Sequence, residues 1–126
     1  MRQYVGIDII EIARIEKAIA HWGKRFLQRV YTEAELRLYH KKPSSLAARF
    51  AGKEAIIKAF GAPTTSINWR EIEILSDPGG QPSVHLRGKA QNQANSLGLD
   101  GFDISLSHSR EYAIALVVGA KKVNPD

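Results

Sequence analysis

The feature that most constrains this chain is a long helical pattern between Pro43 and Gly61. Pro43 and Ser44 form a helix start signal, and Gly61 forms a stop signal. At 100° of rotation per residue, the apolar side chains gather in one sector of about 140°. That sector holds Leu46, Ala47, Phe50, Ala51 and Ile57. The pattern predicts a helix with one buried face, and Glu54 lies in the middle of that face.

Glu54 needs an explanation, because an ionised carboxylate on an apolar face is costly unless it is paired or bound to a metal. Lys58 lies one turn further along the same side. One interpretation is a buried Glu54–Lys58 ion pair, since the i,i+4 spacing favours such pairs. The other is that Glu54 faces a cation or a phosphate-bearing ligand. This stretch alone supports both equally, and a second acidic group elsewhere would decide between them.

Asp8 supplies a second carboxylate. Residues 4–10 alternate as a strand does, with Val5, Ile7 and Ile9 on one face and Gly6, Asp8 and Ile10 on the other. Aspartate is disfavoured inside strands, so Asp8 either caps the next helix or belongs to a site. Two separated carboxylates without a nearby histidine suit Mg²⁺, which is typically held by one or two carboxylates and substrate phosphates. The residues therefore predict a Mg²⁺-dependent phosphoryl-type transfer site.

Basic side chains accompany these acids. Arg49 and Lys53 lie on the long helix and suit phosphate groups. The helix predicted from Glu11 to Trp22 has a polar side that is almost entirely positive, with Arg25 following it. Residues 1–63 carry 12 Lys and Arg against 6 Asp and Glu, within a net charge of +5 for the whole chain. The first half is therefore expected to meet an anionic partner, whether phosphate, nucleic acid or an acidic protein.

The remaining patterns define the fold class. Thr32 and Glu35 fit a capping box, so Glu35 is interpreted as structural. The predicted order is one strand, three helices, a hairpin that begins with a strand near Asn68, one helix and a final hairpin. This order indicates an α+β fold with a mostly antiparallel sheet packed against helices. We expect a single domain over residues 1–126, with a tail from about residue 119 to residue 126.

Composition excludes several classes of protein. The chain has no cysteine, which rules out disulfides, thiolate metal sites and cysteine nucleophiles. No apolar run approaches the ~20 residues of a membrane span. The first residues lack the apolar region of a signal peptide. We therefore expect a cytoplasmic protein with no membrane association.

Several motifs together resemble the holo-acyl-carrier-protein synthases, the small bacterial 4′-phosphopantetheinyl transferases. The first is Gly6-Ile7-Asp8-Ile9-Ile10-Glu11-Ile12-x-Arg14-Ile15, and the second is Arg49-Phe50-Ala51-x-Lys53-Glu54-Ala55-x-x-Lys58-Ala59-x-Gly61. Trp69-x-x-Ile72-x-Ile74, Gly80-x-Pro82, Ser105-Leu106-Ser107-His108 and Ala113-x-Ala115 follow in family order. Gly52 departs from the pattern, because alanine is usual there, but no functional group is lost.

The resemblance implies a 4′-phosphopantetheinyl transferase-like fold and a reaction. Such enzymes move the 4′-phosphopantetheine arm of coenzyme A to a serine of apo-acyl carrier protein and release adenosine 3′,5′-bisphosphate, in support of fatty-acid synthesis. Asp8, Glu54 and Lys58 would be catalytic, with Asp8 and Glu54 holding Mg²⁺ and Lys58 contacting the pyrophosphate. The other residues implied for coenzyme A binding are Arg49, Lys53, Gly61, Pro82, Ser107 and His108.

The resemblance also implies partners. Acyl carrier proteins are small and acidic, and the surface that docks them would carry Arg14, Lys17, His21 and Arg25. Family members form homotrimers with active sites between subunits. The acyl carrier protein and further copies of this chain are therefore the expected partners.

Two rival functions remain open from the residues. A basic α+β module that binds RNA or an anionic protein explains the charge, but it does not explain two acids on apolar faces. The chain also lacks exposed aromatic residues interleaved with basic ones for stacking bases, so we expect no nucleic acid partner. A Mg²⁺-dependent hydrolase of nucleotide pyrophosphates would share Asp8 and Glu54 but would need no protein acceptor.

Overall fold

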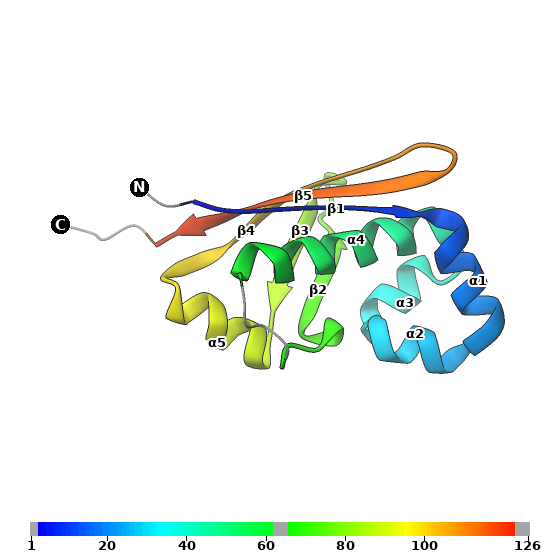
Figure 1. Ribbon diagram of the computed structural model, residues 1–126, viewed down its shortest axis with the longest axis horizontal. Coiled ribbons are helices and arrows are strands. Elements are labelled where there is room, and N and C mark those ends of the chain that lie inside the picture. The colour runs from blue at the N-terminus through cyan, green and yellow to red at the C-terminus, as the bar shows by residue number, and fades with distance from the viewer. Residues whose placement is uncertain (1–2, 62–65, 123–126) are drawn as a thin grey trace.

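The computed structural model describes residues 3–61 and 66–122. Strands β1 (Tyr4–Glu11), β5 (Tyr112–Lys121) and β4 (Leu99–His108) form an antiparallel sheet in the order β1-β5-β4. Strands β2 (Ile72–Ser76) and β3 (Pro82–Leu86) form a separate antiparallel hairpin. Figure 1 shows helix α4 (Pro43–Phe60) running along the three-stranded sheet. The predicted α+β class with antiparallel sheets is confirmed.

The other helices gather at the two ends of the molecule. Helices α1 (Ile12–Trp22), α2 (Lys24–Val30) and α3 (Glu33–Tyr39) lie together at one end, and α5 (Gly88–Ser96) lies at the other (Figure 1). In the described part of the chain four α-helices, rather than the predicted three helices, lie between β1 and β2. The difference is α2, which follows Gly23. Gly23 has φ of 58°, which a side chain would disfavour, and it separates α1 from α2.

Two more predicted boundaries are wrong. The strand expected from Asn68 starts at Ile72, because residues Trp69–Glu71 form a short 3₁₀ helix, η1. The backbone N–H of Asn68 donates to Glu71 Oε1 at 2.8 Å, which holds this turn. Residues 119–121 of the tail expected from about residue 119 belong to β5, which continues to Lys121 opposite Leu99. Residues 123–126 of that predicted tail lie outside the described residues.

Helix α4 is buried on nearly all sides, so the prediction of a single buried face is wrong. The sheet covers one side of it, and β2, α1 and α3 contact its other sides. Its buried apolar residues include Leu46, Ala47, Ala48, Ala51, Ala55, Ile56, Ala59 and Phe60. Phe50, Glu54 and Ile57 are only half-buried. Glu54 therefore lies at the edge of the core and not on the most buried face of α4.

Two glycines allow α4 to pack closely. A Cβ atom at Gly6 of β1 would collide with the backbone oxygen of Ala55 on α4. A Cβ atom at Gly52 would meet Ile74 Cδ1 at 2.5 Å, which explains why glycine fits where alanine is usual in the motif. The close approach at Gly6 brings the inner face of β1, which includes Asp8, against α4.

The outer face of the three-stranded sheet is apolar and exposed. Val5, Ile7 and Ile9 have 52%, 54% and 59% of their surface exposed. Ile7 lies opposite Leu116 and Val5 opposite Val118, so the exposed side chains of β1 and β5 form one patch. Within residues 3–61 and 66–122, no helix is long and apolar enough to cross a membrane.

Candidate active site

Asp8, Glu54 and Lys58 meet where β1 lies against α4. Lys58 Nζ is 2.8 Å from Asp8 Oδ1, and it donates to the backbone oxygen of Ile7 at 3.3 Å. Glu54 Oε1 accepts a hydrogen bond from Trp69 Nε1 at 3.2 Å. Lys58 thus pairs with Asp8, and the interpretation of a buried Glu54–Lys58 pair is wrong.

Asp8 and Glu54 line the same depression, which has a volume of about 380 Å³. The side chain of Asp8 is 16% exposed, whereas that of Lys58 is 58% exposed. The remaining lining comes from β1, α1, α2 and α4 and consists of Ile9, Ile10, Arg14, Ile15, Ala18, Phe26 and Phe50. The two carboxylates therefore share one hollow with Arg14, and Lys58 pairs with Asp8.

This donor set fits Mg²⁺ only with help from a substrate. Within the described residues, no group of three or more His, Cys, Asp or Glu side chains could hold a metal ion. Asp8 and Glu54 would supply two ligand positions, and the rest would come from substrate oxygens and water. Magnesium is commonly bound in this way, through one or two carboxylates together with phosphates.

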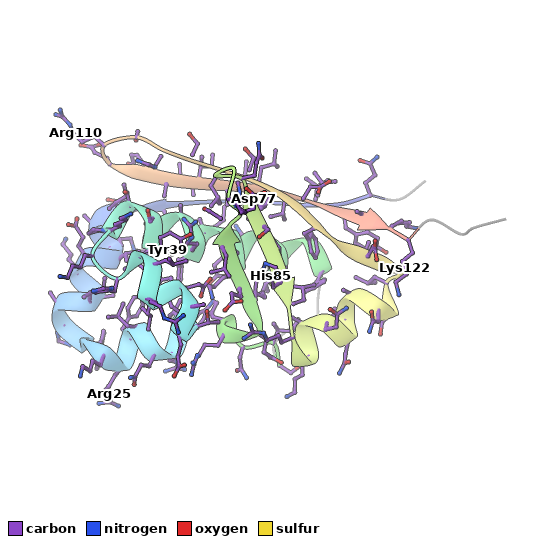
Figure 2. The ribbon with its side chains drawn as sticks, turned by 180° about the vertical axis from the view of Figure 1, so that it is seen from behind. Arg25, Tyr39, Asp77, His85, Arg110 and Lys122 are labelled. Atoms are coloured by element: carbon purple, nitrogen blue, oxygen red, sulfur yellow. The ribbon has the colours of Figure 1, made fainter. Side chains whose placement is uncertain are left out.

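The predicted docking residues form a basic surface beside this depression. Arg14, Lys17 and His21 are exposed on α1, and their spacing places them on one side of the helix. Arg14 also lines the depression itself. Arg25 is exposed on α2 and projects from the helical end of the molecule (Figure 2). Of these four basic residues, Arg14 reaches the depression that holds the two carboxylates.

Lys53 lies in the core, where its side chain is fully buried. Its ammonium is 2.7 Å from Glu35 Oε1 and donates to the backbone oxygens of Ile72 at 2.7 Å and Trp69 at 3.1 Å. These contacts use all three of its donors. Burial lowers the pKa of Lys53, and the neighbouring Glu35 carboxylate opposes that shift. In this structure Lys53 is a structural cation that no ligand can reach.

Glu35 completes this buried pair. It forms the predicted capping box with Thr32, whose backbone N–H donates to Glu35 Oε1 at 2.8 Å. Glu35 Oε2 accepts from the backbone N–H of Ile74 at 2.8 Å. The structural interpretation of Glu35 is confirmed, and the residue joins α3, α4 and β2.

The other residues implied for coenzyme A binding lie apart from the depression. Arg49 is 6% exposed, stacks on the Tyr39 ring at 3.7 Å and donates to the backbone oxygen of Ile74. Gly61 ends α4 and Pro82 begins β3. Ser107 and His108 are exposed near the end of β4, and as successive strand residues they point to opposite faces. Within the described part of one chain, these residues do not lie at the depression of Asp8 and Glu54. Their roles in coenzyme A binding stay predictions.

Trp69 is a neighbour of the site that the sequence did not reveal. Strand patterning placed it in β2, whereas it belongs to η1 and contacts Glu54. Two signals were available: Trp69 opens the family motif Trp69-x-x-Ile72-x-Ile74, and a partly buried indole N–H usually finds an acceptor.

Comparison with known proteins identifies the family. Residues 4–117 match the model of the 4′-phosphopantetheinyl transferase superfamily. The chain belongs to this superfamily. It is 56% identical over 115 residues to a holo-[acyl-carrier-protein] synthase of Dehalococcoides mccartyi, covering 91% of this chain and 96% of that relative. It is 48% identical to one of Herpetosiphon aurantiacus, covering 90% and 95%.

The fold of this chain matches that of a solved structure from the same superfamily. The Helicobacter pylori holo-[acyl-carrier-protein] synthase in complex with coenzyme A is 33% identical and superposes with a TM-score of 0.83. The match covers 92% of this chain and 99% of the other. The predicted transferase-like fold is confirmed.

Proposed function

We propose that this chain is a holo-acyl-carrier-protein synthase, which transfers 4′-phosphopantetheine from coenzyme A to a serine of apo-acyl carrier protein. The observation that carries the proposal is the shared depression of Asp8 and Glu54 beside Lys58 and Arg14. Two carboxylates repel a pyrophosphate unless a cation lies between them, and Mg²⁺ fits this donor set. Relatives of the same name and the relative solved with coenzyme A support the choice of substrate.

The residues of the chain then have distinct tasks in the reaction. The serine oxygen forms a bond to the phosphorus that carries the pantetheine arm, and the anhydride bond breaks. Adenosine 3′,5′-bisphosphate leaves with the bonding electron pair. Lys58, held by Asp8, stabilises the charge that develops on the phosphate oxygens. The carboxylates of Glu54 and Asp8 are the groups available to accept the serine proton. Bound Mg²⁺ would neutralise pyrophosphate charge at these carboxylates.

The basic surface of Arg14, Lys17, His21 and Arg25 docks the acidic carrier protein in this proposal. These side chains are exposed, and Arg14 borders the depression. Complementary charge speeds the encounter of two proteins and fixes their orientation. The acceptor serine would thereby be presented beside Glu54. We place this reaction in the cytoplasm.

The proposal includes a homotrimer with active sites between subunits. The exposed apolar patch of Val5, Ile7, Ile9, Leu116 and Val118 supports it, because contiguous apolar patches of this kind mark interaction surfaces. The separation of the site residues supports it as well. Ser107 and His108 are exposed and lie apart from the Asp8 depression of their own chain, so a neighbouring chain would supply them to a shared site.

Mass spectrometry of apo-acyl carrier protein incubated with coenzyme A, Mg²⁺ and this protein tests the function. A gain of the phosphopantetheine mass on the carrier protein is expected. A pyrophosphate hydrolase would consume coenzyme A without modifying the carrier protein, and a binding module would leave both unchanged. Either of these results would refute the transferase assignment.

A further inference from the structure

Two consecutive residues of α4 hold Trp69 from opposite ends. Lys53 Nζ donates to the backbone oxygen of Trp69 at 3.1 Å. Trp69 Nε1 donates in turn to Glu54 Oε1 at 3.2 Å. Neighbouring helix residues point about 100° apart, so Lys53 reaches into the core while Glu54 faces the depression. Trp69 therefore connects a buried structural cation to a candidate metal ligand.

The position of Trp69 is fixed by several further contacts. The ammonium that holds its backbone oxygen is itself bound to Glu35 at 2.7 Å and to the backbone oxygen of Ile72 at 2.7 Å. The indole ring packs on the Phe50 ring, with centroids 5.8 Å apart. With its backbone and ring both held, the indole N–H points in one direction, toward Glu54.

We propose that Trp69 is a positioning residue for the metal ligand Glu54. The terminal torsion of a glutamate side chain is broad, so a carboxylate without a partner samples many orientations. The indole N–H binds Oε1 and leaves Oε2 free of this contact, and Glu54 lines the depression that Asp8 shares. Hydrogen-bond partners outside the ligand shell commonly orient metal ligands in this way. The inference rests on the proposed function, and it adds a residue that acts through Glu54.

The test replaces Trp69 by phenylalanine, which keeps an aromatic ring against Phe50 but removes the N–H donor. Mn²⁺ serves as the probe, and its free concentration is followed by electron paramagnetic resonance in the presence of coenzyme A. We expect about 10-fold weaker Mn²⁺ binding for Trp69→Phe. The matched control is Trp22→Phe, which changes the only other tryptophan of the chain, 54% exposed on α1. Unchanged Mn²⁺ affinity in folded Trp69→Phe would overturn the proposal.

A second measurement leaves Trp69 in place. In Trp22→Phe the indole of Trp69 is the only tryptophan fluorophore. Adding Mn²⁺ and coenzyme A should change its emission, with a midpoint equal to the Mn²⁺ dissociation constant measured by resonance. Emission that stays constant through saturation would contradict contact between Trp69 and the metal ligand, whether or not Trp69→Phe folds.

The two proposals fail in different ways. If the wild-type protein does not modify apo-acyl carrier protein, the transferase function is refuted. If the wild-type protein modifies it and Trp69→Phe binds Mn²⁺ as tightly as the wild type, only the positioning role is refuted.

Discussion

Replacing Lys53 by methionine should destabilise the protein far more than any change to an exposed lysine of the same helix. The ammonium of Lys53 is fully buried and serves three acceptors, Glu35 Oε1 and the backbone oxygens of Trp69 and Ile72. Methionine fills much of the same volume but donates no hydrogen bond. The variant leaves the buried Glu35 carboxylate without its cation and two carbonyl groups without this donor.

The magnitude follows from the burial of the pair. Removing one partner of a buried ion pair costs about 3–5 kcal/mol of unfolding free energy. Glu35 keeps two backbone donors, from Thr32 and Ile74, so we place the loss at the lower end, about 3 kcal/mol. Because small domains are stable by only about 5–15 kcal/mol, this loss is a large fraction of the total. It corresponds to a fall in melting temperature of roughly 10 °C.

The control is Lys58→Met, which removes the partner of Asp8 from the same helix. Lys58 is 58% exposed, and exposed pairs contribute about 0–1 kcal/mol. Urea unfolding of both variants at equal protein concentration measures the difference, and it should exceed about 2 kcal/mol. Equal losses in the two variants would refute the structural role assigned to Lys53.

Further predictions concern pH, docking and assembly. Burial raises the pKa of Tyr31, so the unfolded chain releases this proton above pH about 10 while the folded chain retains it. The free energy of unfolding should therefore fall above that pH. Tyr31→Phe should reduce this pH dependence, whereas Tyr112→Phe, at an exposed position, should leave it unchanged. Steady-state kinetics of Arg14→Glu should show a KM for the carrier protein raised about 10-fold, near 1.4 kcal/mol, with little change for coenzyme A. Equal effects on both substrates, or the same effect from Lys89→Glu on α5, would contradict docking at Arg14. Leu116→Glu should leave the chain folded but monomeric in sedimentation, and a trimer that persists would contradict assembly through the apolar patch.

Sequence reasoning succeeded where the interactions are local. The capping box of Thr32 and Glu35 joins residues three apart, so its pattern is visible in the chain itself. The alternation in β1 correctly separated Asp8 from Ile7 and Ile9, because strand geometry fixes which side chains share a face. The alternation does not indicate which face of β1 packs against the rest of the protein. In the structure, the apolar face of Val5, Ile7 and Ile9 is the exposed one.

The sequence did not predict contacts in which the partner of a side chain comes from a distant segment of the chain. The spacing of Glu54 and Lys58 left a pair within α4 as one of two equally supported interpretations. The structure shows instead that Gly6 allows β1 to approach α4 closely and that Lys58 pairs with Asp8. Lys53 was expected at the coenzyme A site because the family resemblance implied it and because a lysine on this helix suits phosphate groups. Only the fold shows that this neighbour points into the core toward Glu35.

The rate of carrier-protein modification by Glu54→Gln bears most directly on the proposed site. Glutamine keeps an oxygen for the indole N–H of Trp69 but loses the negative charge that a metal needs. Transfer of phosphopantetheine, followed by mass spectrometry with coenzyme A and Mg²⁺, should be at least about 100-fold slower than in the wild type, with the melting temperature retained. Transfer within a few-fold of the wild-type rate would contradict a metal-binding role for Glu54.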